Sequence, residues 1–188
     1  MKTFVLAAAA ALVFPAAALA HAKVSPPFGL KGQSQVYTLA VPTEKDGLTT
    51  TQIEFTPPQG FNIDSFVPSP GWTRNVQQTG SGENAVITKV TWTGGKVPTG
   101  EDSAFSFLAS TAAAKTYTFA VRQTYSDGSV VDWNGPESSD TPAPTIDSRT
   151  SLGGGSSSTL PIIAIVVGAI GIVLGLVAVA SGGKRALA

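Results

Sequence analysis

The chain has 188 residues with 12 basic and 12 acidic side chains, a single histidine and no cysteine. The absence of cysteine excludes disulfides and thiolate metal sites. Residues 21–159 contain nine basic and twelve acidic side chains, a formal charge of −3 without a basic stripe, so we expect no nucleic-acid partner.

The first 20 residues have the organisation of a secretory signal peptide. A lysine at position 2 is followed by an apolar stretch over residues 4–14, by Pro15 and by the small residues at positions 18–20. The segment is short for a membrane span. Cleavage at its end makes His21 the first residue of the mature protein.

An N-terminal histidine is a strong metal chelate, because its amine and its ring Nδ1 close one six-membered ring around a cation. The sole methionine, Met1, is lost with the signal peptide, so the mature chain has no sulfur ligand. The donors that remain are the nitrogens of His21 and oxygens. Among divalent first-row ions such a set favours copper, and we predict Cu(II) as the bound ion.

The residues from 21 to 142 show an apolar pattern of period two, which is typical of strands. Apolar side chains alternate over residues 37–41, 105–107 and 117–121. Turn formers interrupt these runs at short intervals, and Asp127-Gly128 lies between two apolar runs as in a hairpin. This region is predicted to be all-β, an antiparallel β-sandwich of immunoglobulin-like or cupredoxin-like type.

The C-terminal part has the pattern of a membrane anchor. Residues 143–159 are rich in Pro, Ser and Gly and are predicted to form a flexible linker. Residues 160–180 carry no charge and would extend roughly 31 Å as a helix, enough to cross a bilayer. Basic residues occur in the tail at 181–188, which places the tail in the cytoplasm. We predict a single-pass protein of the cell membrane with an extracytoplasmic N-terminal domain.

Two further side chains are candidates for the surroundings of a metal at His21. Glu54 stands between Ile53 and Phe55 in an apolar strand, where alternation places it on the solvent face. Spacing alone leaves open whether its carboxylate reaches His21. Trp133 is embedded in polar, acidic sequence, so we expect its ring at a domain edge, where an indole could shield a metal from water. Burial in the core is the alternative for any tryptophan.

The domain combines several motifs along its length. It opens with His-x-x-Val-x-Pro at residues 21–26, continues with Val-Pro-Thr-Glu at 41–44, holds a glutamate at position 54 and contains Asp-Gly-Ser-Val-Val-Asp-Trp-Asn-Gly-Pro at 127–136. This combination resembles the YcnI-like family of bacterial copper-binding domains over roughly residues 21–142. The resemblance implies a mono-histidine brace at His21, with Glu54 as a carboxylate ligand and Trp133 lining the site.

These observations predict a membrane-anchored, extracytoplasmic Cu(II)-binding protein of copper homeostasis, acting as a metallochaperone or a buffer. Its expected partners are the copper ion, the membrane and a copper transporter or CopC-like protein. We expect no enzymatic activity, because a polysaccharide-cleaving copper enzyme needs a second imidazole and no nucleophile motif such as G-x-S-x-G is present. The alternative is a metal-independent, immunoglobulin-like surface or interaction module tethered to the membrane, in which His21 is incidental to the cleavage site.

Overall fold

The computed structural model describes residues 21–151, 164–172 and 175. The β-domain ends at Thr150, and residues 164–172 form a separate helix. Within these described ranges, no helix combines the length and apolar character needed to cross a membrane. The predicted signal peptide lies outside the described residues, as does much of the predicted span, so both stay predictions.

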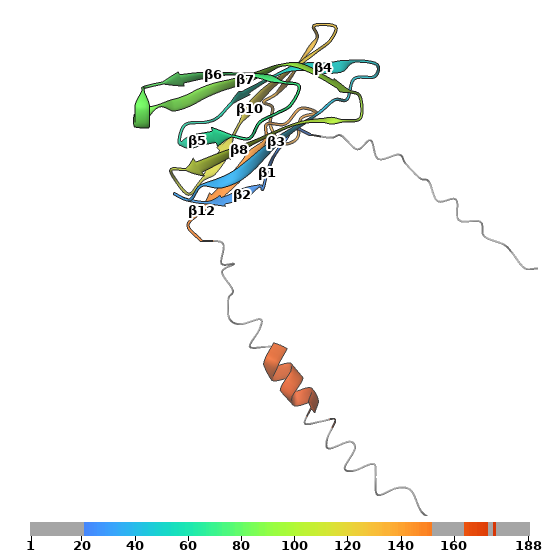
Figure 1. Ribbon diagram of the computed structural model, residues 1–188. Helices are drawn as coiled ribbons and strands as arrows, with labels where there is room; N and C mark the ends of the chain where they lie inside the picture. The colour runs from blue at the N-terminus through green and yellow to red at the C-terminus, as the bar shows by residue number, and fades with distance from the viewer. Residues whose placement is uncertain (1–20, 152–163, 173–174, 176–188) are drawn as a thin grey trace, which may run out of the picture. The chain divides into compact units, whose positions relative to one another are not determined.

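The β-domain contains twelve strands in three sheets (Figure 1). The first sheet has the order β1 (Lys23–Ser25), β3 (Gln35–Pro42), β8 (Asp102–Thr111) and β5 (Phe61–Phe66). The second has the order β11 (Val130–Trp133), β10 (Ala120–Tyr125), β4 (Thr49–Thr56), β7 (Val86–Pro98) and β6 (Thr73–Thr79). The third is small, with the order β2 (Phe28–Leu30), β12 (Thr145–Arg149) and β9 (Thr116–Thr118). A short 3₁₀ helix, η1 (Gly82–Asn84), connects β6 to β7.

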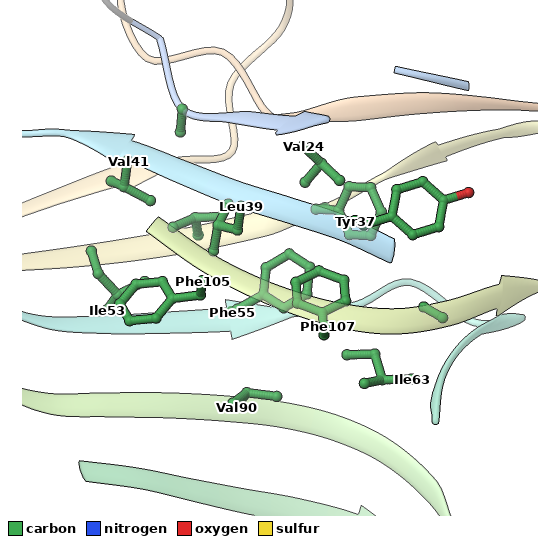
Figure 2. Close-up of a cluster of buried hydrophobic side chains, with 14 of the residues drawn as sticks. Val24, Tyr37, Leu39, Val41, Ile53, Phe55, Ile63, Val90, Phe105 and Phe107 are labelled. Atoms are coloured by element: carbon green, nitrogen blue, oxygen red, sulfur yellow. The ribbon is translucent and has the colours of Figure 1, made fainter. Parts of the chain in front are cut away.

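The core lies between the two large sheets and is rich in aromatic rings (Figure 2). Phe55 of β4 lies 5.5 Å from Phe107 of β8 between ring centroids, and Trp92 of β7 stacks on Phe105 of β8 at 4.1 Å. Both pairs join the second sheet to the first. The large apolar residues at every second position of the three runs are buried, namely Tyr37, Leu39, Val41, Phe105, Phe107, Tyr117, Phe119 and Val121, so the predicted β-sandwich is confirmed. The burial follows from the strand period, which turns alternate side chains to the same face.

The expected hairpin turn at Asp127-Gly128 joins β10 to β11. Gly128 has a φ of 81°, a conformation that a residue with a Cβ rarely adopts. The Asp127 carboxylate accepts hydrogen bonds from the Ser129 hydroxyl at 2.6 Å and from the Ser129 backbone N–H at 2.8 Å. These bonds, the hydroxyl bond first, lower the pKa of Asp127 because they favour its charged form.

Replacing Ser129 with alanine should therefore raise the pKa of Asp127 part of the way back to its ordinary value. The lowered pKa in the folded state means that this carboxylate stabilises the fold above its unfolded pKa, and that the stabilisation is lost as the pH falls through the folded pKa. An NMR titration of the Asp127 carboxyl carbon in wild type and Ser129→Ala measures the difference. Identical titration curves would show that the hydroxyl bond does not act on Asp127.

The linker predicted over residues 143–159 begins with a strand instead. β12 pairs in parallel with β2 and antiparallel with β9, and its Ile146 is 1% exposed. Ser148 is also buried, and its hydroxyl shares a 2.6 Å hydrogen bond with that of Thr111. The predicted domain boundary at 142 is therefore too early. Only two residues of β12 face inward, but pairing with β2 on one side and β9 on the other is enough to make the strand part of the domain.

Candidate metal site

His21 is held in place by the edge strand of the first sheet. It is separated from β1 by Ala22, and β1 pairs with β3 through Lys23–Ala40 and Val24–Leu39. Ala22 and Val24 are buried in the core at 4% and 3% exposure. Because side chains alternate along an extended segment, this burial turns His21 and Lys23 to the opposite side. The N-terminal segment is thus fixed right up to the histidine.

His21 lines a cleft of about 720 Å³, which we call the His21 cleft. The lining consists of residues 21–25 with Pro27, of residues 135–137 and 142–145, and of Thr118 of β9. The ionisable side chains of this lining are His21, Lys23 and Glu137. The rest of the lining is mainly proline, alanine and small hydroxyl side chains.

The imidazole of His21 has an unused polar atom. Its Nε2 is buried and has no hydrogen-bond partner, a situation shared among the described residues only by Trp92 Nε1 and Ser103 Oγ. Of these three atoms, only the one from His21 belongs to a residue that lines the cleft. An unsatisfied buried polar group costs about 1–3 kcal/mol. The chelate expected for an N-terminal histidine uses the amine and Nδ1, not this Nε2.

Glu54 lies on the outer face of the second sheet. Ile53 and Phe55 beside it are fully buried, which confirms the alternation expected for this strand. Both carboxylate oxygens are engaged, since Oε1 accepts a 3.0 Å hydrogen bond from Gln52 Nε2 and Oε2 forms a 2.9 Å ion pair with Lys89 Nζ. Glu54 lines a separate hollow of about 130 Å³, not the His21 cleft. Its role as a metal ligand stays a prediction.

Trp133 lies on β11, the edge strand of the second sheet, but its ring faces inward and is fully buried. Its indole N–H donates a 3.0 Å hydrogen bond to Gln123 Oε1. The expectation of a ring at the domain edge is therefore wrong, because the polar neighbours Asp132 and Asn134 alternate outward while the indole turns to the core. Trp133 does not line the described cleft, but the chain reaches the cleft wall at Gly135, two residues later.

Gln123 is a structural residue that was not predicted from the sequence. It is fully buried in β10, and its Nε2 donates to the Pro42 carbonyl at 2.8 Å and to Thr50 Oγ1 at 2.7 Å. Together with the bond from Trp133, these contacts join β11, β10 and β4 of the second sheet to β3 of the first. The signal was present in the sequence, since Gln123 occupies an inward position between two buried residues, Val121 and Tyr125.

No group of three or more His, Cys, Asp or Glu side chains that could hold a metal occurs in the part of the chain that the structure describes. The structure brings His21 and Glu137 to one cleft and leaves Glu54 and Trp133 elsewhere. Glu137 was not singled out from the sequence, although it follows the Asn-Gly-Pro break directly.

Comparisons with known proteins agree with this architecture. Residues 21–147 match the family described as a domain of unknown function, DUF1775. The chain is 34% identical over 134 residues to "Copper-binding protein CutI" of Bacillus subtilis (strain 168), which covers 70% of this chain and 63% of that protein. A crystal structure of a protein from Nocardia farcinica, described as having an immunoglobulin-like fold, is similar with a TM-score of 0.59 and 32% identity, covering 69% of this chain and 99% of that one.

The Nocardia structure confirms the immunoglobulin-like form of the predicted sandwich. The chain spans about 63% of the length of its Bacillus relative, and the matched family region ends at residue 147, within β12. The family match covers more than half of the chain and confirms the resemblance to YcnI-like domains. The chain belongs to the DUF1775 family.

Proposed function

We propose that this protein binds Cu(II) outside the cell membrane, holds it through His21 as a mono-histidine brace and serves copper homeostasis as a metallochaperone or buffer. The observation that carries the proposal is the position of His21. It follows a predicted signal-peptidase site and lines a cleft of the β-domain. The copper-binding description of the Bacillus relative supports copper as the ion.

The chemistry of the brace requires cleavage immediately before His21. In the uncleaved chain the nitrogen of His21 belongs to a peptide bond, whereas in the mature protein it is an amine that can share a cation with Nδ1. Nitrogen and oxygen donors without sulfur favour Cu(II). Binding also requires both nitrogens to be free of protons, so the affinity falls as the pH is lowered.

Trp133 and Glu54 have different roles in the proposed site. Trp133 supports the cleft wall from within the core through its bond to Gln123. The resemblance assigns Glu54 as a ligand, and for that role its carboxylate has to exchange the Lys89 ammonium and the Gln52 amide for the cation. Glu54 would therefore have to give up existing partners before it could bind a cation.

A site with few protein ligands suits a protein that passes copper to a partner. A brace from one residue leaves coordination positions open, through which a ligand from a copper transporter or a CopC-like protein can enter and displace the first set. A C-terminal membrane helix would keep the domain near such a partner. We propose no catalytic step for this site.

A titration of the mature protein in detergent tests the proposal. Mass spectrometry first establishes that the purified chain begins at His21, and Cu(II) is then titrated against a competing chromophoric chelator. We expect one tight site per chain. A chain that begins at His21 and shows no tight site would instead support the metal-independent, immunoglobulin-like module.

A further inference from the structure

Glu137 is the acidic side chain of the His21 cleft. Among the described residues that line the cleft, it provides the sole carboxylate, while Lys23 and His21 provide the basic groups. The Glu137 side chain is exposed, and no hydrogen bond or ion pair engages its carboxylate within the described part of the chain. Its oxygens are therefore available to a ligand that occupies the cleft.

The backbone that carries Glu137 is closed into a loop by hydrogen bonds. The Gly135 N–H donates to the Thr141 carbonyl at 3.0 Å, and the Ala143 N–H donates to the Gly135 carbonyl at 2.9 Å. Inside this loop, the Ser139 N–H and hydroxyl both donate to the Pro136 carbonyl, at 2.9 and 2.7 Å. The Pro136 carbonyl, directly before Glu137, is thus held in place by two hydrogen bonds.

A side chain at Gly135 would crowd the point where the loop closes. A Cβ at this position would overlap the Ser139 hydroxyl and lie 3.1 Å from the Thr141 carbonyl oxygen. Two residues earlier, the buried ring of Trp133 anchors the same segment in the core. The loop is therefore fixed at its start by Trp133 and at its close by the segment that enters β12, and the backbone needs little ordering when a ligand binds.

Glu54 differs from Glu137 on each of these points. Its two oxygens already have partners in Gln52 and Lys89, and it lines a different hollow. A cation bound at Glu54 has to compete with an ammonium group at 2.9 Å. At Glu137, a doubly charged cation meets a carboxylate without an ion-pair partner among the described residues.

We propose that Glu137 is the carboxylate ligand of the cation that His21 holds. This assignment rests on the proposed function. Glu137 supplies an oxygen donor and a negative charge from the segment 135–137 of the cleft lining, so that the cation joins this segment to His21. Binding then ties the Gly135–Ala143 loop to β1.

Two matched variants of the mature, full-length protein test the assignment. Glu137→Gln and Glu54→Gln each remove one negative charge and keep the shape of the side chain. We expect Glu137→Gln to weaken Cu(II) binding by about tenfold or more and to change the Cu(II) EPR spectrum, since even outer-sphere groups of metal sites have effects of that order. Glu54→Gln tests the ligand that the family resemblance implies. Equal melting temperatures of the metal-free proteins confirm that the variants are folded.

The outcomes separate the two proposals. If the wild type binds Cu(II) tightly and Glu137→Gln leaves its EPR spectrum unchanged, the assignment of Glu137 is wrong while the proposed function stands. A spectral change in Glu54→Gln alone also overturns the assignment of Glu137, and it supports Glu54, the ligand implied by the family resemblance. If the wild type has no tight site, the proposed function fails and the assignment with it.

Discussion

A Gly/Ser tag placed ahead of His21 is expected to lower the affinity for Cu(II) by about a hundredfold, which corresponds to about 2.8 kcal/mol of binding free energy. The tag leaves the imidazole and the cleft unchanged but converts the His21 amine into a peptide nitrogen. The cation then loses a donor that the same residue holds at the right distance from Nδ1. Competition titration of tagged and untagged mature protein measures the loss.

The control is the same tag attached after Ala188, where it cannot alter the His21 amine. This variant should bind Cu(II) as tightly as the untagged protein. The tag ahead of His21 has to be long enough to keep its own amine away from the ring, because a nearby amine could replace the lost donor. Equal affinity of the two tagged proteins would remove the amine from the coordination sphere and exclude the brace.

Replacing Gln123 with leucine is expected to lower the free energy of unfolding by about 2–6 kcal/mol, the sum expected for two buried polar groups left without partners. The groups are the Trp133 indole N–H and the Pro42 carbonyl, which Gln123 contacts at 3.0 and 2.8 Å. Thr50 keeps its 2.7 Å hydrogen bond to Thr43 and loses only its second partner. Urea denaturation followed by tryptophan fluorescence measures the change.

Gln77→Leu provides the matched control for this variant. Gln77 lies on β6 with an exposed side chain, and the same substitution there should change the stability by no more than about 0.5 kcal/mol. The comparison separates the buried hydrogen bonds from the general effect of exchanging an amide for an apolar group. Comparable stability of the two variants would show that the Gln123 bonds contribute little to the fold.

The sandwich could be predicted from the sequence because strand alternation reports which side of a strand is buried. The runs at 37–41 and 105–107 turn every second residue to the core, and the aromatic residues among them dominate it. The alternation of apolar and polar residues in β12 is too weak to predict a strand. Only Ile146 and Ser148 face inward, and its partners β2 and β9 are distant in the sequence, so the pairing that stabilises it could not be inferred.

The candidate site was predicted only in part, for a similar reason. The position of His21 at a cleavage motif is a local property of the chain. Residues 135–137 and 142–145 line the same cleft from more than a hundred positions away, and their contribution depends on the fold. The ion pair of Glu54 likewise joins residues 35 positions apart, from two neighbouring strands. Local sequence therefore indicated a ligand but not the carboxylate that shares its cleft.

The place of β12 in the third sheet has a mechanical consequence. β12 is the last strand of the domain, and the chain leaves it toward the C-terminal segment after Arg149. Its backbone hydrogen bonds to β2 and β9 link it to a partner on each side, so a force applied along the axis of β12 loads the bonds of both ladders together rather than one after another. Residues 142–145, which form part of the His21 cleft, lead directly into this strand. Tension along this axis therefore reaches the cleft lining only through a strand that resists sliding.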